Sequence, residues 1–377
     1  MNSIALKMLF GDRAKYLMLL AGLTFSTMLI VQQGSIFWGL MMWSQSGISN
    51  INVPVWVTDP HINQVEEVKP LADTAVNIVR SVPGVEWAVP LYKGVQRARL
   101  ADGNFQQISL VGLDAATLLG RPSVVIAGDI QNLRIPEAVA LDQEAVKRLG
   151  GPTRMQVGTV FEINDQRARV VAIVDVQKSF QNIPFVYTTY QRALSYTPPE
   201  RRKLSFVLVN PVEGVTPEAL AKRIEHETEL GAFTAEAFGW KTISWVLEHT
   251  GIGVNFGTTV LLGFLVGMAI AGQTFYLFTV ENLKQFGALK AIGAHTGMLA
   301  RMILLQSFTV GIIGYGIGVG LATFFGLTAG KGGALPYMET WPLLVGVFIA
   351  LLGICGISSA ISIRKLAKLE PAIVFRN

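Results

Sequence analysis

Four long apolar segments limit what this 377-residue chain can fold into more than any other feature of its sequence. They cover residues 17–43, 252–280, 302–327 and 341–363. Each is long enough to cross a hydrocarbon layer of about 30 Å as a helix. A mean hydropathy of +0.44 agrees with this, because soluble chains of similar length are more polar. The sequence therefore predicts an α-helical membrane protein with four transmembrane helices.

The basic residues indicate how the chain is oriented. The region 45–241 holds 20 Lys and Arg against 21 Asp and Glu, so it is close to neutral. Of the other 11 basic residues, all but Lys331 fall on one side of the membrane if the chain crosses four times. Basic residues collect on the cytoplasmic side, so both termini and the loop 281–301 are predicted to be cytoplasmic. This topology explains the net charge of +5, and we expect no nucleic-acid binding.

The 44–240 region, between the first and second apolar segments, has the composition of a globular α+β domain. Two strand–helix–strand patterns occur, one at each end of it. The strands are expected at 53–57, 85–91, 204–209 and 232–237, and the helices at 71–82 and 216–230. The valines at 53–57 alternate as in a half-buried strand. We expect the two units to form a split α+β sandwich assembled from both ends of the domain.

The stretch between these units is rich in strand signals. Asp102-Gly103 predicts one hairpin turn and Asn164-Asp165 a second. A short helix at 142–149 starts at Asp142, a plausible cap, and is closed by two glycines. The single cysteine, Cys355, lies in the last apolar segment, so the domain must be stable without an internal disulfide.

The loop 281–301 carries a short amphipathic helix. Phe286, Leu289 and Ile292 recur at three-residue steps, with Lys284 and Gln285 among the polar positions around them. Apolar residues exposed on such a loop indicate docking against another protein. The alternative is a helix that lies in the lipid headgroups.

This stretch resembles the coupling-helix signature of MacB/FtsX-type (type VII) ABC transporter permeases, most of all the DevC-like subgroup. The matching residues are Gly287, Leu289, Lys290, Ala291, Ile292 and Gly293. Together with Glu281 and Phe286 they form the predicted ATPase-coupling site. Asn282 and Gln285 stand where the family usually has Arg and Glu. The basic tail with Pro371-Ala372 is also similar to that of the family.

The resemblance implies a permease subunit of an ABC exporter in the bacterial inner membrane. A separate cytoplasmic ATPase would bind ATP, and the permease would transmit the resulting motion to its periplasmic domain, a mode called mechanotransmission. It also implies a homodimer and, for the DevC-like subgroup, a periplasmic adaptor (membrane fusion protein) and an outer-membrane channel. The periplasmic domain is expected to be MacB-like, with Porter-like and Sabre-like subdomains. An FtsX-like scaffold that regulates a cell-wall enzyme, or a lipoprotein-releasing permease, is the alternative.

Under this interpretation the chain divides into nine segments. They are a cytoplasmic N-terminal interfacial segment (1–16), the first span (17–43), the periplasmic domain (44–240), a stalk with the second span (241–280), the cytoplasmic coupling loop (281–301), the third span (302–327), a short periplasmic loop (328–340), the fourth span (341–363) and a cytoplasmic tail (364–377).

Glycines four residues apart mark two of the predicted spans. Gly263 and Gly267 lie in the second, and Gly314 and Gly318 in the third. Such spacing is typical of close helix packing in lipid, and we expect one of these faces to form the homodimer. The glycines at 316–320 are not a nucleotide-binding fingerprint, because no strand precedes them.

The sequence predicts no catalytic site. The four histidines show no metal-ligand spacing, and no serine lies in a G-x-S-x-G motif. Gly330-Lys331 is not a P-loop, because Gly332 replaces the required Ser or Thr. We therefore expect a non-catalytic subunit without metal or cofactor, with ATP bound and hydrolysed by the partner.

Overall fold

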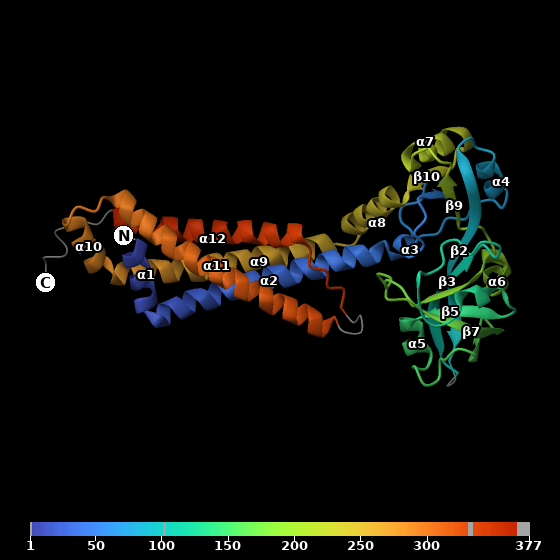
Figure 1. Ribbon diagram of the computed structural model, residues 1–377, viewed down its shortest axis with the longest axis horizontal. Helices are drawn as coiled ribbons and strands as arrows, with labels where there is room; N and C mark the ends of the chain where they lie inside the picture. The colour runs from blue at the N-terminus through green and yellow to red at the C-terminus, as the bar shows by residue number, and fades with distance from the viewer. Residues whose placement is uncertain (1, 101–102, 331–334, 368–377) are drawn as a thin grey trace. The chain divides into compact units, whose positions relative to one another are not determined.

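The computed structural model describes residues 2–100, 103–330 and 335–367 (Figure 1). The chain forms two compact units. One, here called the membrane unit, comprises Met1–Leu40 and Gly251–Asn377, and the other, the globular domain, comprises Met41–Thr250. Asp102 of the first predicted turn and Pro371-Ala372 of the tail lie outside the described residues.

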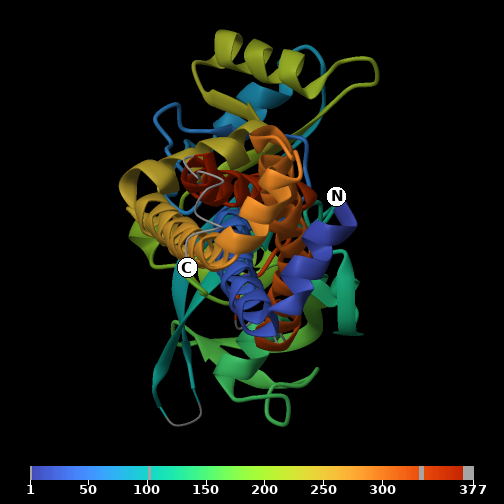
Figure 2. The ribbon, with the colours of Figure 1, turned by 90° about the vertical axis from the view of Figure 1, so that its left-hand side faces the viewer.

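The described part of the membrane unit is built from helices. These are α1 (Asn2–Gly11), α2 (Arg13–Ser44, which continues into the globular domain), α9 (Ile252–Glu281), α10 (Leu283–Ala291), α11 (Thr296–Ala329) and α12 (Trp341–Ala367). Four of them, α2, α9, α11 and α12, are long and apolar enough to cross a membrane, which confirms the predicted number of spans. Figures 1 and 2 show them running side by side as a bundle. Several extend beyond the apolar stretches, because hydropathy detects only the part of a helix that is apolar.

Apolar side chains from all four long helices meet inside the bundle. Leu19 and Leu23 of α2 pack with Phe275 of α9, Val310 of α11 and Ile354 of α12. Small hydroxyl side chains add hydrogen bonds between helices: the Ser26 Oγ donates to the Gly263 carbonyl oxygen at 2.8 Å. Such bonds remove polar groups from contact with lipid while they hold two helices close together.

The globular domain begins and ends in one four-stranded part of a sheet. Its strands are β1 (Val55–Thr58), β2 (Val85–Arg99), β9 (Phe206–Pro211) and β10 (Gly231–Thr234), in the order β10-β1-β9-β2, and its helices are α4 (Ala75–Arg80) and α7 (Pro217–Thr228). All neighbouring strands here are antiparallel. Each strand–helix–strand unit therefore receives a strand of the other unit between its own two. This confirms the split arrangement expected from the two ends of the domain.

Strand β1 differs from its expected form, because all four of its residues are buried. Val55 and Val57 face a core that includes Val79 of α4 and Leu220 of α7. Trp56 points to the other face, where its ring lies 5.4 Å from that of Phe206 and 5.9 Å from that of Phe238. The strand is paired on both edges, and a hydrophobic core covers each of its faces, so the half-buried interpretation was wrong.

The last strand of this part is shorter than predicted. It ends at Thr234, whose Oγ1 accepts a hydrogen bond from the Ala237 amide at 3.1 Å and so caps helix α8 (Ala235–His249). The helix expected from about residue 241 thus begins six residues earlier. It stops before Gly251, which has φ +62° and precedes α9. A Thr followed by Ala-Glu-Ala is a helix-cap signal, but the predicted strand 232–237 extended past it.

The second part of the sheet is the strand-rich insert. It contains β3 (Phe105–Leu113), β4 (Val124–Gly128), β5 (Ala138–Asp142), β6 (Val160–Ile163), β7 (Gln166–Asp175) and β8 (Phe185–Thr189). The other short helices of the globular domain are α3 (Ser46–Ser49), η1 (Ile130–Arg134), α5 (Gln143–Leu149), α6 (Tyr190–Ser195) and η2 (Pro199–Arg201). Strand β2 belongs to both parts, because its 15 residues pair first with β9 and then with β3. Both predicted hairpins are present, β2–β3 and β6–β7. Asn164 and Asp165 both have positive φ, as a two-residue hairpin turn requires.

Asp142 caps α5, as predicted, and also ties it to strand β8. Its carboxylate accepts hydrogen bonds from the Ala145 amide at 2.5 Å and the Phe185 amide at 2.9 Å. The residue is 3% exposed, and burial raises the pKa of its carboxyl to about 6, because loss of water outweighs the two hydrogen bonds.

Asp142 should make the globular domain less stable as the pH rises. The stability that its raised pKa contributes is fully present below about pH 4 and is lost as the pH passes through 6, a change of about 3 kcal/mol. We expect Asp142→Asn to remove this dependence. Urea unfolding of the full chain in detergent at pH 4 and pH 7 measures it, as the difference between parent and variant at each pH. An equal difference at both would contradict the assignment.

Candidate functional site

The connection between α9 and α11 is helical and firmly fixed at both ends. At its start the Asn282 side chain donates to the Phe278 carbonyl oxygen at 2.8 Å. At its end Gly293 has φ +106°, and the Ala294 amide donates to the Leu289 carbonyl oxygen at 3.0 Å. A residue with positive φ just past a helix is the usual way to end it and reverse the chain. Helix α10 therefore begins and ends at defined residues.

Phe286 fixes α10 to the rest of the membrane unit. Its side chain is fully buried among Ala5 of α1 and Leu299, Met302 and Ile303 of α11. Leu289 is half-buried against the same cluster, and Gly287 is buried. Phe286 belongs to the predicted ATPase-coupling site, but its side chain is already buried within this chain. It is part of the chain's own core, and it positions the helix.

The opposite face of α10 is exposed. Lys284, Ala288, Ala291 and Ile292 lie on it, at the spacing of one helix face. Ile292 is 85% exposed, which is the largest exposed fraction among the large apolar side chains in the described residues. Gly293 follows it and is also exposed, whereas Lys290 is half-buried. The predicted coupling residues thus divide into an inner set around Phe286 and an outer set around Ile292.

Glu281 binds within the chain. Its carboxylate forms an ion pair with Lys15 of α2, and the same ammonium group lies 2.5 Å from the Asp12 carboxylate. Lys15 therefore joins the start of α2 to the end of α9, directly before the coupling helix. This places Glu281 among the residues that hold α10 in position.

Helix α2 packs against all four glycines of the predicted packing faces. A Cβ on Gly263 would meet Leu29, and one on Gly267 would lie 2.4 Å from the Ser26 Oγ. A Cβ on Gly314 would meet Leu23, and one on Gly318 would lie 2.7 Å from the Thr27 Cβ. Neither pair is available for a second copy of the chain, so the expectation that one of these faces forms the homodimer was wrong.

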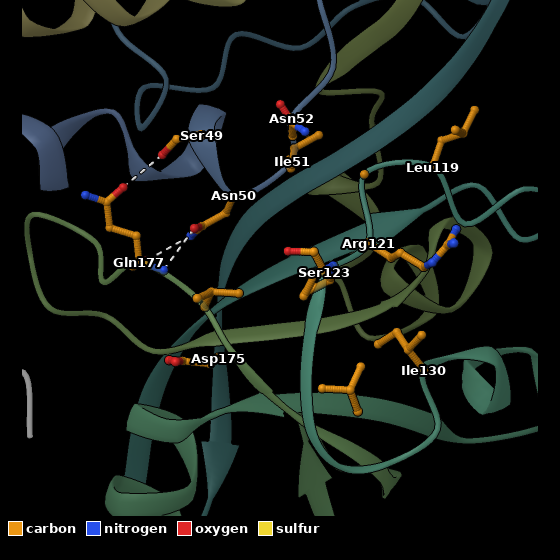
Figure 3. A pocket seen from close by; sticks show the side chains of 14 residues that line it. Ser49, Asn50, Ile51, Asn52, Leu119, Arg121, Ser123, Ile130, Asp175 and Gln177 are labelled. Atoms are coloured by element: carbon orange, nitrogen blue, oxygen red, sulfur yellow. Dashed lines mark hydrogen bonds between the residues drawn. The ribbon is translucent and has the colours of Figure 1, made fainter.

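The globular domain contains a polar pocket of about 840 Å³ (Figure 3). Asn50 closes one side of it through paired hydrogen bonds: its side chain donates to the Gln177 carbonyl oxygen at 2.8 Å and accepts from the Gln177 amide at 2.9 Å. Arg121 and Asp175 also line the pocket. No three His, Cys, Asp or Glu side chains gather as metal ligands anywhere in the part of the chain that is described.

Family comparisons identify both units. The family model described as MacB-like periplasmic core domain matches residues 16–227, which is more than half of the chain. The chain belongs to the MacB/FtsX family of ABC transporter permeases. The model described as FtsX-like permease C-terminal matches residues 257–371, which include α10, α11 and α12. The predicted family is thus confirmed, and so is a MacB-like α+β domain inserted between the first and second of four membrane helices.

Individual relatives in the MacB/FtsX family are distant. An ABC transporter permease of Methanocaldococcus jannaschii is 28% identical over 239 residues, 59% of this chain and 58% of that one. The macrolide export ATP-binding/permease protein MacB of Bartonella quintana is 24% identical over 256 residues, 62% of this chain and 37% of that protein. The chain therefore spans less than two thirds of the length of either relative. Among solved structures, the periplasmic region of MacB from Actinobacillus actinomycetemcomitans is similar to this chain. The alignment covers 53% of this chain and 94% of that structure, with 12% identity and a TM-score of 0.38.

Proposed function

We propose that this permease is the membrane subunit of an ABC exporter and works with a separate cytoplasmic ATPase that docks on α10. The observation that carries the proposal is the division of this helix into a buried and an exposed face. Phe286 is fully buried in the chain's own core, and Ile292 is 85% exposed. An apolar side chain held out on a fixed helix gains free energy when a partner covers it.

The same helix is suited to carry motion into the membrane. A displacement of its exposed face must move Phe286, and Phe286 packs on Leu299, Met302 and Ile303 of α11. Helix α11 continues without interruption for 34 residues, and α9, on the other side of the connection, for 30. Helices that are packed and hydrogen-bonded along their length move as stiff elements. These features support mechanotransmission, in which ATP-driven motion on the cytoplasmic side reaches the globular domain.

The wider assembly is proposed from the family. Cytoplasmic termini, an inner-membrane location and a homodimer fit the segregation of basic residues and the two-fold assembly expected of such permeases. A periplasmic adaptor and an outer-membrane channel would follow from the resemblance to the DevC-like subgroup. The relative named for macrolide export supports an export role over an FtsX-like scaffold or lipoprotein release. Any dimer contact must use surfaces other than the four glycines that hold α2.

ATP hydrolysis tests the division of labour. The purified chain alone is expected to release no phosphate from ATP, and addition of its cognate ATPase should produce hydrolysis that depends on both proteins. The control is the ATPase alone, measured in the same detergent and lipid. Hydrolysis that co-elutes with the permease, in a preparation free of other subunits, would refute the proposal that the catalytic chain is separate.

A further inference from the structure

A hollow of about 760 Å³ in the membrane unit is lined by residues of α1, the start of α2 and the start of α10. Its lining includes the apolar side chains of Ile4 and Met8 and the polar side chains of Lys7, Arg13, Asn282 and Gln285. All of these elements belong to one compact unit. The lining thus combines apolar and polar side chains, and its polar part includes Gln285 of the coupling helix.

Two cations of this lining have no partner among the described residues. Lys7 and Arg13 are exposed, and within the described residues neither side chain forms an ion pair or a hydrogen bond. The Asp12 carboxylate also lines the hollow, but it forms an ion pair with the Lys15 ammonium group at 2.5 Å. The remaining charge at the mouth of the hollow is therefore positive, and it favours an anionic ligand.

The surroundings indicate that this anion is attached to an apolar chain. Ile4 and Phe10 of α1 are 42% and 44% exposed, and both are on the short helix that carries Lys7. This helix directly precedes the membrane-crossing α2. Apolar side chains beside cations, on a helix next to a span, fit the boundary between headgroups and acyl chains.

We propose that the hollow binds the headgroup phosphate of an anionic phospholipid. Lys7 and Arg13 contact the phosphate, Gln285 donates a hydrogen bond to the headgroup, and Ile4 lies against the first methylenes. Because Gln285 belongs to α10, the bound lipid bridges α1 and the coupling helix. The inference rests on the proposed function only in assigning the lipid to the cytoplasmic leaflet.

Native mass spectrometry of the full chain in neutral detergent tests the proposal. The probes are phosphatidylglycerol and phosphatidylcholine with identical acyl chains, and inorganic phosphate. We expect phosphatidylglycerol to bind about tenfold more tightly than phosphatidylcholine, because only the first carries a net charge. Lys7→Gln and Arg13→Gln should each weaken phosphatidylglycerol about fivefold. Lys284→Gln, which removes an exposed charge of α10 outside this lining, should leave it unchanged.

Three outcomes would overturn the inference. Equal binding of the two lipids would show that the headgroup is not recognised. If Lys284→Gln weakened phosphatidylglycerol binding as much as Lys7→Gln or Arg13→Gln, the binding would depend on general surface charge and not on this hollow. Inorganic phosphate bound as tightly as phosphatidylglycerol would make free phosphate the ligand. Unchanged melting temperatures of the variants are expected, because both side chains are exposed and unpaired in the described residues. The ATPase is absent from this assay, so its result and that of the docking proposal are independent.

Discussion

Replacement of Ile292 by Glu is expected to abolish recovery of the ATPase with the purified permease and to stop transport. The side chain is 85% exposed in the isolated chain, so the change costs the permease itself little. On docking, the lost apolar burial removes about 1.5–3 kcal/mol, and an unpaired buried carboxylate removes more. We therefore expect affinity to fall at least a hundredfold, on the order of 3 kcal/mol. Co-purification from membranes, followed by a transport assay, measures both effects.

The matched control is Ile292→Leu, which preserves apolar volume and should retain docking. Phe286→Ala would be an unsuitable probe, because its removal from the buried cluster damages the permease itself by about 3–5 kcal/mol. If α10 merely lies in the headgroups, Ile292→Glu should leave ATPase recovery and transport at the level of the parent. That result would falsify the docking assignment.

Replacement of Gly318 by Leu should unfold the helix bundle at a lower temperature and reduce the yield of folded permease. A Cβ at this position would lie 2.7 Å from the Thr27 Cβ and 2.8 Å from the Thr24 carbonyl oxygen, so α2 must move away. Such overpacking costs about 3 kcal/mol, because a backbone oxygen cannot give way as a flexible side chain does. Thermal unfolding in detergent, followed by circular dichroism, provides the measurement.

Gly316→Leu on the same helix is the control. Apart from its chain neighbours and the backbone of its own helix, no atom lies within 4 Å of the position where its Cβ would be, so the bulk should be accommodated. Similar losses from both substitutions would show that leucine is not tolerated anywhere on α11, and would contradict the assigned contact between α11 and α2. A loss only at 316 would reverse the assignment of the two faces.

The number of spans and the split sheet could be predicted from the sequence because each leaves a local signal. Apolar length indicates a membrane helix, since an unpaired backbone is not tolerated in lipid. Strand, helix and turn residues follow one another in order at both ends of the globular domain. Local patterns do not show which strand is covered on both faces, and for this reason the full burial of β1 was missed.

The inner and outer faces of the coupling helix could not be separated by the three-residue spacing alone. At about 100° per residue, Phe286 and Ile292 are about 120° apart around the helix, so they cannot share one narrow face. The apolar residues mark two surfaces, one for α1 and α11 and one that is exposed. Sequence showed that the residues are apolar, but only packing shows which of them the chain already uses.

The sequence also does not show which helix packs against the glycine faces. Small residues four apart permit a close approach of helices, but they are the same whether the approaching helix is in the same chain or in a second copy. In this structure α2 packs against all four glycines. Its own sequence holds the complementary Ser26, Thr24 and Thr27, small side chains that allow this approach.

Photo-cross-linking from α10 tests the central claim most directly. A benzoyl-phenylalanine is placed at Lys284, which lies on the exposed face and leaves Ile292 intact, in membranes that contain the ATPase. A second is placed at Phe105, which is 60% exposed in the globular domain. We predict an adduct with the ATPase from position 284 and none from position 105. No adduct from 284, or an ATPase adduct from 105, would contradict the proposal that this helix is the cytoplasmic docking surface.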